Sequence, residues 1–357
     1  MLEIRLIPEN EFQRVREATI DKYTRLALLS DMCSANTLAT VKRAGSGHLG
    51  SSFSSLDIVT YLYHYEMNIA ELGINHPDRD IYFSSKGHDV PGHYAVLHSL
   101  GLLSEERFQH LRRHDGTHGH PDVSIAGIEA NSGSLGMGIS KAKGMALAKK
   151  MSGAKGRVMV MTGDGELQEG QIWESLQTAA YQKVNNLIAI VDFNKIQTDK
   201  FVNDIIDLGD LTRKFEVFGW HAETCNGHDF AELENAFCRL KQINDRPKVL
   251  IADTIKGKGI SFMEGPRALK DGNGLYPWHS GAPDDDTFEV GYAEIVNRIN
   301  TRLEESGLAS LNTSVMATRE KNRVRLKDTA EKVVTAYGAV SYTHLTLPTN
   351  RVAGGGG

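Results

Sequence analysis

The chain has 357 residues, with 40 Lys or Arg against 45 Asp or Glu, which gives a formal net charge of −5. This dispersed, nearly balanced charge argues against a nucleic-acid partner. No apolar stretch is long enough to span a membrane, and the charged N-terminus lacks the apolar core of a signal peptide, so we expect no membrane partner. Three cysteines without a CxxC pair (Cys33, Cys225 and Cys238) favour a reducing, cytoplasmic location.

Helical periodicity dominates the first part of the chain. It predicts helices at 11–45, 56–65 and 94–100, and a fourth helix that follows the turn at 131–134 and runs to about Met151. The serines of 51–55 are expected to provide the start of the second helix, because small hydroxyl residues cap helix N-termini. The first third of the chain is therefore predicted to be largely helical.

Three near-continuous apolar runs then predict buried strands, at 157–162, 186–192 and 248–255. Strands are apolar on both sides when helices cover both faces of a parallel sheet. A helix is predicted at 170–183, and strand, helix and strand together take about thirty residues, which fits one βαβ unit. We predict an α/β fold with a doubly wound, mainly parallel sheet and helices on both faces.

Polar residues follow the ends of the first two predicted strands. Gly163, Asp164 and Gly165 come after one strand, and Asn194 after the next. The carboxyl ends of neighbouring parallel strands meet at one edge of a sheet, where ligands of open α/β folds collect. A carboxylate and a carboxamide there suit Mg²⁺ or Ca²⁺ carrying a diphosphate, and the glycines let backbone approach the phosphates.

Eight motifs in a fixed order, between about Asp31 and Pro283, resemble the N-terminal, diphosphate-binding half of transketolases. They are SGHLGSS (46–52), SSKGHDVPGHYAVL (84–97), HGHPD (118–122), NSGSLGMG (131–138), GDGELQEGQIWE (163–174), FGWH (218–221), DTIKGKGISFME (253–264) and WHSGAP (278–283). The resemblance implies the thiamin diphosphate-binding fold, with thiamine diphosphate and Mg²⁺ as cofactors, where Ca²⁺ or Mn²⁺ can substitute. It implies transfer of a two-carbon ketol unit from a ketose phosphate to an aldose phosphate.

The resemblance also implies roles for individual residues. The cation ligands are Asp164, Asn194 and the backbone carbonyl of Ile196. The residues that contact the cofactor are His88, Gly133, Ser134, Leu135, Gly165, Glu166, Asn194 and His279. His48, His279 and His120 are the catalytic residues, which polarise the substrate carbonyl, move its protons and bind its hydroxyls. Glu169 lies at an interface with the neighbouring pyrimidine-binding domain.

Several alternatives stay open. The spacing of His114, His118 and His120 also suits a zinc site, as in a histidine-metal hydrolase. The KGKG sequence at 256–259 is either close to the site or a solvated loop. Other thiamine-dependent enzymes, such as deoxyxylulose-phosphate synthase or a 2-oxoacid dehydrogenase subunit, share the cofactor motif. A non-catalytic cofactor-binding module is a further possibility.

The predicted domain plan ends in an incomplete second domain. Residues 1–310 form the diphosphate-binding domain, 311–323 a linker, and 324–340 resemble the opening helix of the pyrimidine-binding domain. The tail 341–357 is either translated adaptor sequence or a natural disordered tail. Within 270–286, abundant Gly, Pro and Asp predict an active-site loop.

The resemblance implies a partner that carries the pyrimidine-binding half, in a homodimer or a heterotetramer, and we expect the chain alone to be inactive. Two departures from the family pattern stand beside the expected site. Ser280 follows His279 where relatives usually have Gly, and Leu49 replaces a common Pro, as in shorter, two-gene forms.

Overall fold

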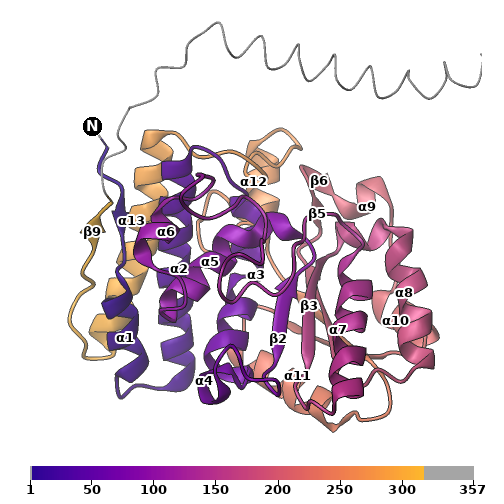
Figure 1. The fold of residues 1–357 in the computed structure, drawn as a ribbon. Helices are drawn as coiled ribbons and strands as arrows, with labels where there is room; N and C mark the ends of the chain where they lie inside the picture. Colours follow the sequence, from indigo (N-terminus) through magenta and orange to yellow (C-terminus); the bar gives the residue numbers. More distant parts are fainter. Residues whose placement is uncertain (1, 317–357) are drawn as a thin grey trace, which may run out of the picture. The chain divides into compact units, whose positions relative to one another are not determined.

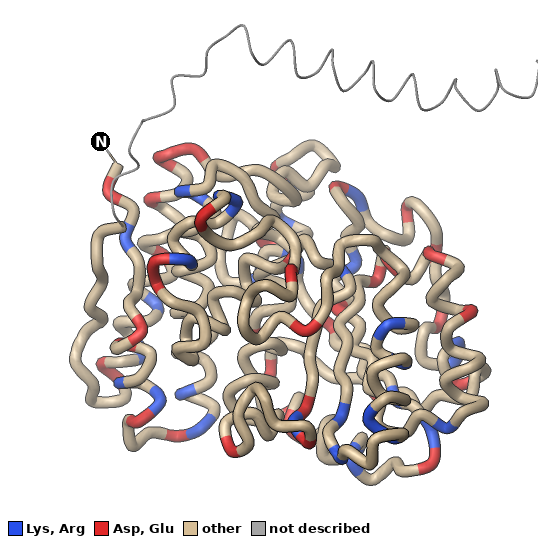
Figure 2. The backbone as a smooth tube through the Cα atoms, viewed as in Figure 1, with Lys and Arg blue, Asp and Glu red and all other residues tan. Residues whose placement is uncertain are grey.

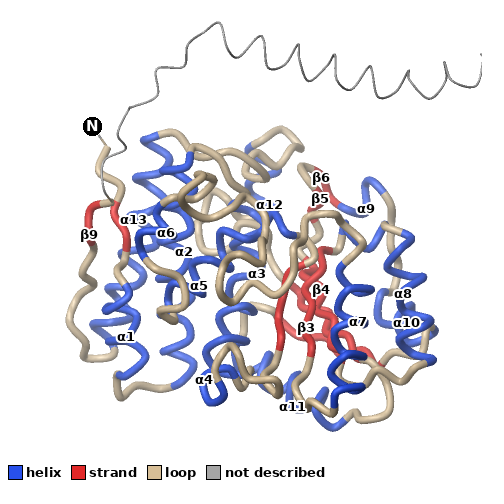
Figure 3. Tube along the Cα trace, viewed as in Figure 1, coloured by secondary structure: helices blue, strands red, loops and turns tan. Residues whose placement is uncertain are grey.

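A five-stranded parallel sheet organises the fold, in the strand order β2-β3-β4-β8-β7. The strands are β2 (Ile81–Ser84), β3 (Val158–Gly163), β4 (Leu187–Phe193), β7 (His221–Asn226) and β8 (Lys248–Asp253). Figure 3 shows the sheet in red. The computed structural model describes residues 2–316, and the segments predicted at 324–340 and 341–357 lie outside them. The predicted parallel sheet is confirmed, and β2 and β7 add its two edges.

Alternate residues of the central strands pack into two cores. Met159 and Met161 of β3 belong to one core, whereas Val158 and Val160 belong to the other. The first core is completed by α2 (Lys22–Ala44), α3 (Leu49–Tyr61), α5 (Val90–Ser99), α11 (Phe230–Gln242) and α13 (Asp285–Glu305). The second core is completed by α7 (Gly138–Ser152), α8 (Gly170–Tyr181) and α10 (Leu211–Val217). Helices therefore cover both faces, as predicted for a doubly wound sheet (Figure 1).

The predicted βαβ unit is β3, α8 and β4. Its two strands are direct neighbours in parallel, and Gly163 lies opposite Asp192 in the register. Both strands therefore end at the same edge of the sheet, with Asp164 and Asn194 just beyond them.

Two helix predictions were wrong in detail. The helix predicted at 11–45 is two helices, α1 (Glu9–Glu17) and α2, and the Asp21 carboxylate caps α2 by accepting from the N–H groups of Tyr23 and Thr24. The serines of 51–55 do not start a helix but lie inside α3, which begins at Leu49. They are tolerated there because hydroxyls such as those of Ser52 and Ser55 donate to carbonyls one turn back.

The remaining elements are short. They are β1 (Arg5–Leu6), a π-helical turn (Leu62–Glu66), α4 (Ile69–Leu72), 3₁₀ turns at Gly87–Asp89 and Gly165–Gln168, α6 (Glu105–Gln109), β5 (Ile196–Gln197), β6 (Lys200–Phe201), α9 (Val202–Ile205), α12 (Gly265–Asp271) and β9 (Ser314–Val315). The loop predicted at 270–286 is irregular between α12 and α13. β9 pairs with β1, so the start of the predicted linker joins the 2–316 unit, and the domain limits stay a prediction.

Charge and hydropathy of the described residues fit this architecture. Acidic and basic positions are scattered over the backbone in Figure 2. Within residues 2–316, no helix has both the length and the apolar character needed to cross a membrane.

Candidate active site

The ends of β3 and β4 bring the two predicted cation ligands to one place. The Asp164 carboxylate accepts hydrogen bonds from the backbone N–H groups of Gly165 and Lys195. Lys195 directly follows Asn194, whose side-chain Oδ1 accepts from the N–H of Ile196 at 3.1 Å. The carboxylate, the amide oxygen and the Ile196 backbone therefore lie beside one another, as the strand spacing predicted.

These groups fit a hard cation. Asp164 is buried, and its pKa is raised to about 6 by burial and by the neighbouring charge of Asp192, although two backbone N–H groups oppose the shift. The carbonyl of Ile196 already accepts from a positive group, the Lys256 ammonium, at 3.0 Å. A carboxylate, an amide oxygen and a carbonyl that attract positive charge are the donors that Mg²⁺ prefers.

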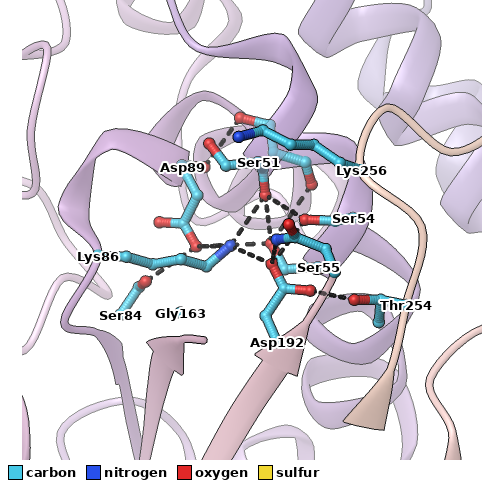
Figure 4. A network of polar contacts seen from close by, with 12 residues as sticks. Ser51, Ser54, Ser55, Ser84, Lys86, Asp89, Gly163, Asp192, Thr254 and Lys256 are labelled. Carbon is cyan, nitrogen blue, oxygen red and sulfur yellow. Dashed lines mark hydrogen bonds and ion pairs between the residues drawn. The ribbon is translucent and has the colours of Figure 1, made fainter. Parts of the chain in front are cut away.

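Asp192 is the centre of a buried polar network beneath this point (Figure 4). Its carboxylate accepts from Lys86 Nζ and Ser54 Oγ, each at 2.6 Å, and also from the Thr254 hydroxyl. Burial alone would raise the pKa of Asp192, but the Lys86 charge and the hydrogen bonds hold it below its ordinary value. Lys86 in turn pairs with Asp89 at 3.3 Å. This buried charge is compensated inside the chain.

The same network orients the Asn194 amide. Its Nδ2 donates to Asp192 Oδ2 at 3.1 Å, so the carbonyl end of the amide is directed away from that carboxylate. Asp192 therefore orients Asn194 so that its side-chain oxygen is available as a metal ligand. Sequence reasoning did not single out Asp192 or Lys86, although an acidic residue that ends an apolar strand was an available signal.

Lys256 corrects one sequence alternative. The side chain is buried rather than solvated, and its ammonium donates to the carbonyls of Ile196 and Thr198, both at 3.0 Å. Burial lowers its pKa to about 8, against the opposing charge of Asp164. The KGKG loop thus delivers one positive charge to the site, while Lys258 pairs with Glu264 at 3.4 Å.

A glycine turn forms the adjoining wall. Gly133 has φ +118°, and a Cβ there would lie 2.6 Å from the His120 ring. The N–H of Gly136 donates to Glu166 Oε1 at 2.8 Å, and Glu166 Oε2 accepts from Gly163, which ties the turn to the end of β3. Gly165 is also closely packed, since a Cβ there would lie 2.8 Å from the Gln197 side chain. Ser134 and Leu135 are exposed on this turn, before α7 begins.

Three of the predicted histidines form a cluster. The ring centroids of His48 and His88 are 5.2 Å apart, those of His48 and His279 5.2 Å, and those of His88 and His279 5.6 Å. The segments that carry His48 and His279 are joined, since Gly50 N–H donates to the Trp278 carbonyl at 3.1 Å. His120 lies outside this triangle, against the glycine turn.

Burial keeps the clustered imidazoles neutral. It lowers the pKa of His48 and of His279 to about 4, and positive neighbours, Arg112 for His48 and Lys256 for His279, add to the shift. The pKa of His88 is held well below its ordinary value by burial and by Lys86. Each ring can therefore offer one N–H donor and one nitrogen acceptor at neutral pH.

Comparison with known proteins identifies the family. A family model described as the transketolase, thiamine diphosphate binding domain matches residues 28–273. The chain belongs to the transketolase family. Its likeness to the transketolase from Campylobacter jejuni, at 27% identity and a TM-score of 0.65, agrees with this and confirms the predicted fold. That match covers 82% of this chain and 44% of the solved one, so the chain spans less than half of a full transketolase.

Shorter relatives match over most of their length. The chain is 39% identical over 251 residues to an apulose-4-phosphate transketolase subunit of Actinobacillus succinogenes, covering 70% of this chain and 87% of that protein. It is 38% identical over 235 residues to the 6-deoxy-6-sulfo-D-fructose transketolase subunit SqwG of Clostridium sp., covering 65% and 85%. Human transketolase is 33% identical over 285 residues, but only 44% of that protein is covered. Membership of the transketolase family removes the other thiamine-dependent families as alternatives.

Two remaining predictions have different outcomes in this transketolase domain. Within residues 2–316, no group of three or more His, Cys, Asp or Glu side chains is arranged to hold a metal, so the zinc alternative at His114, His118 and His120 gains no support. Glu169 is exposed just before α8, and its interface role stays a prediction.

Proposed function

We propose that this chain is the diphosphate-binding half of an enzyme that transfers a two-carbon ketol unit from a ketose phosphate to an aldose phosphate. The observation that carries the proposal is the hydrogen bond from Lys195 N–H to Asp164 across the ends of β3 and β4. It holds a carboxylate beside the Asn194 amide, next to a glycine turn and a histidine cluster, within a thiamine diphosphate-binding domain.

The cation site comprises Asp164, Asn194 Oδ1 and the Ile196 carbonyl. Mg²⁺ bound there would neutralise diphosphate charge and lower the pKa of Asp164 from its raised value, because a nearby positive charge favours the carboxylate. Ca²⁺ or Mn²⁺ can replace Mg²⁺ in such an all-oxygen site. Lys256, which is 2% exposed, supplies further positive charge beside the same carbonyl.

The diphosphate lies along the glycine turn in this proposal. Backbone N–H groups of Gly133, Ser134 and Leu135 would donate to its oxygens, and Gly165 allows close approach from the other strand end. Glu166 holds the two glycine segments together. Gly87, directly before His88, packs against the backbone of Gly133, and the His88 ring contacts the rings of His48 and His279. When bound, thiamine diphosphate supplies the carbanion chemistry that no side chain of the protein can provide.

The histidines act on the sugar. A neutral imidazole can donate its N–H to the substrate carbonyl oxygen and accept a proton from a hydroxyl, so His48 and His279 stabilise developing charge and move protons. Burial keeps both rings neutral, so that each can donate one hydrogen bond and accept one proton at neutral pH. His120, beside Gly133, binds substrate hydroxyls at the edge of the cluster.

A partner completes the enzyme. The relatives that match over most of their length are named as subunits of transketolases rather than as whole enzymes. This naming supports a separate pyrimidine-binding partner in a homodimeric or heterotetrameric assembly in the cytoplasm. Exposed Glu169 lies at that interface in our proposal. The chain alone is then expected to bind cofactor but not to turn over substrate, and ketol transfer by the purified chain alone would contradict this.

Titration calorimetry tests the proposal. The purified chain is expected to bind thiamine diphosphate with Mg²⁺ present and to lose binding in EDTA, because the diphosphate needs the cation. Equal binding in EDTA would contradict the cation site. Ketol transfer on addition of a pyrimidine-binding partner would support the enzyme, whereas cofactor binding without transfer in that complex would favour a non-catalytic module.

A further inference from the structure

One tyrosine in the loop between α12 and α13 joins two segments of the candidate site. Tyr276 is 2% exposed, and its N–H donates at 2.8 Å to the carbonyl of Asp199, in the turn of the β5–β6 hairpin. Its hydroxyl donates to the Met263 carbonyl at 2.9 Å. The ring packs in one apolar cluster with Ile196, whose carbonyl belongs to the proposed cation site. The tyrosine therefore ties the loop both to the hairpin and to the segment that follows β8.

Two glycines leave room for this ring. Gly50 lies two positions after His48, and a Cβ there would lie 2.8 Å from Tyr276 Cε1. Gly257 has φ +77°, and a Cβ there would lie 2.4 Å from the tyrosine hydroxyl. Any larger residue at either position would collide with the ring. The SGHLGSS and KGKG segments therefore fit closely around Tyr276.

The ring also faces the buried ammonium of Lys256. The Nζ atom lies 5.1 Å from the ring centroid, within the distance of about 6 Å at which the negative face of an aromatic ring attracts a cation. The ammonium donates to the carbonyls of Ile196 and Thr198, and within residues 2–316 no carboxylate forms an ion pair with it. Because a buried charge needs compensation, Tyr276 supplies part of what an acidic neighbour supplies to Lys86.

We propose that Tyr276 is a positioning residue that holds Lys256 against the cation site, where the lysine charge is available to the diphosphate. The inference rests on the proposed function and adds to it a residue that lies outside the eight sequence motifs. Its role is indirect, since it acts through Lys256 and through the hairpin that carries Ile196. Without the ring, the lysine side chain is expected to turn away from the Ile196 carbonyl.

Chemical labelling of the chain without ligands tests the contact. Acetic anhydride acetylates accessible amines, and peptide mass spectrometry gives the rate for each lysine, with exposed Lys155 as the internal reference. Tyr276→Leu removes the aromatic face, so Lys256, which is 2% exposed, should be acetylated at least about tenfold faster than in the wild type. Tyr276→Phe keeps the ring and should change this rate less than about threefold. An unchanged rate in Tyr276→Leu would overturn the proposal.

Tyr292 of α13 provides the matched control. It is partly buried and stacks on Phe288, and its hydroxyl has no partner among residues 2–316. Tyr292→Leu removes a comparable ring and should leave the labelling of Lys256 unchanged. Equal exposure of Lys256 in both leucine variants would mean general loosening and would overturn the proposal. If Tyr276→Leu does not fold, Tyr276→Met gives the same test, because a flexible methionine fills irregular space.

Calorimetry then connects the contact to the cofactor. With Mg²⁺ present, Tyr276→Leu is expected to bind thiamine diphosphate about 10- to 30-fold more weakly than the wild type, and Tyr276→Phe less than about threefold more weakly. Lys256→Met should lose at least as much affinity as Tyr276→Leu. Adding Tyr276→Leu to Lys256→Met should cost less than a further factor of about three, because the tyrosine acts through the lysine.

The outcomes separate this inference from the proposed function. Additive losses in the double variant would overturn the positioning role, as would a Tyr276→Leu variant that exposes Lys256 but binds the cofactor normally. Failure of the wild type to bind thiamine diphosphate would instead contradict the proposed function. The labelling rates would then still decide whether Tyr276 holds Lys256 in place.

Discussion

The two ends of the candidate site, the strand ends of β3 and β4 and the histidine cluster, differ in whether their buried polar groups have partners within the chain. At the strand ends, Asp192 is buried and fully engaged by Lys86, Ser54 and Thr254. At the histidine end, His279 Nδ1 is buried without a partner among residues 2–316, and no carboxylate within that range pairs with the Arg112 guanidinium. The Asp192 network is compensated within the chain, whereas we expect substrate and partner to supply the missing groups at the histidine end. A buried charge that is paired within the chain, such as Asp192, is therefore expected to stabilise the fold, whereas one left without a partner is expected to serve binding or catalysis.

The strongest test of this contrast is Asp192→Asn. It leaves Lys86 with only one buried carboxylate partner, and breaking a buried ion pair costs about 3–5 kcal/mol. We expect urea unfolding at pH 7 to show a loss of that size. The control Asp245→Asn removes an exposed carboxylate that pairs with Arg246, and should not move the unfolding midpoint. A similar small effect for both variants would mean that the network does not stabilise the fold.

Asp164→Asn should behave in the opposite way. The pKa of Asp164 is raised to about 6, so the ionised carboxylate costs stability at pH 7. This cost decreases as pH falls below about 6 and is gone below the ordinary carboxyl pKa of 3.8. Without ligands the variant should be at least as stable as the wild type. Its affinity for thiamine diphosphate with Mg²⁺ should fall about 100-fold or more, since even changes to the partners of a metal ligand cost about 10- to 100-fold.

Thermal unfolding measures the stability of the variant, and calorimetry on the same samples measures its affinity for the cofactor. Asp204→Asn, an exposed change on α9, is the matched control and should alter neither quantity. A destabilised Asp164→Asn that still binds the cofactor normally would reverse the roles assigned to the two aspartates.

A smaller effect is expected from pH. Burial lowers the pKa of His93 to about 3, while its Nε2 is 2.8 Å from the Tyr63 hydroxyl. Its contribution to stability is complete above the unfolded pKa of about 6.5 and is lost as pH falls below it, by up to about 1.4 kcal/mol per pH unit. Urea unfolding between pH 7 and pH 5 should show a steeper decline for the wild type than for His93→Gln. Parallel curves would show that His93 is not the group that resists protonation.

Glu169→Gln should have the smallest effect. The side chain is exposed, so the free energy of unfolding should change by less than about 0.5 kcal/mol. If Glu169 lies at the partner interface, sedimentation analysis should show association weakened by about three- to tenfold, the size of one surface charge contact. Unchanged association would remove Glu169 from that interface.

The sequence predicted the parts of the fold that local pattern determines. The apolar runs of β3, β4 and β8 and the polar residues after β3 and β4 were visible because each occupies a short stretch of chain. β7 was missed because it is an edge strand, in which only Cys225 is buried, and β2 because it has only 4 residues. Edge strands lack the two-sided burial that makes an apolar run.

Long-range pairing was not visible in the sequence. Lys86 and Asp192 are 106 positions apart, and Ser54 and Asp192 138 apart, so only the fold could bring them together. The left-handed backbone of Arg112 likewise depends on a bridge within its loop, without a glycine to signal it. The histidine residues were predicted from motifs, but their spacing of 5.2–5.6 Å came from the structure.

The central claim is that one cation is shared by the ends of β3 and β4. A crystal structure of the chain with thiamine diphosphate and Mn²⁺, with the metal located by anomalous scattering, tests it most directly. The account predicts a single peak in contact with Asp164, Asn194 and the Ile196 carbonyl. A metal bound to the diphosphate with either side chain outside its coordination sphere would contradict it.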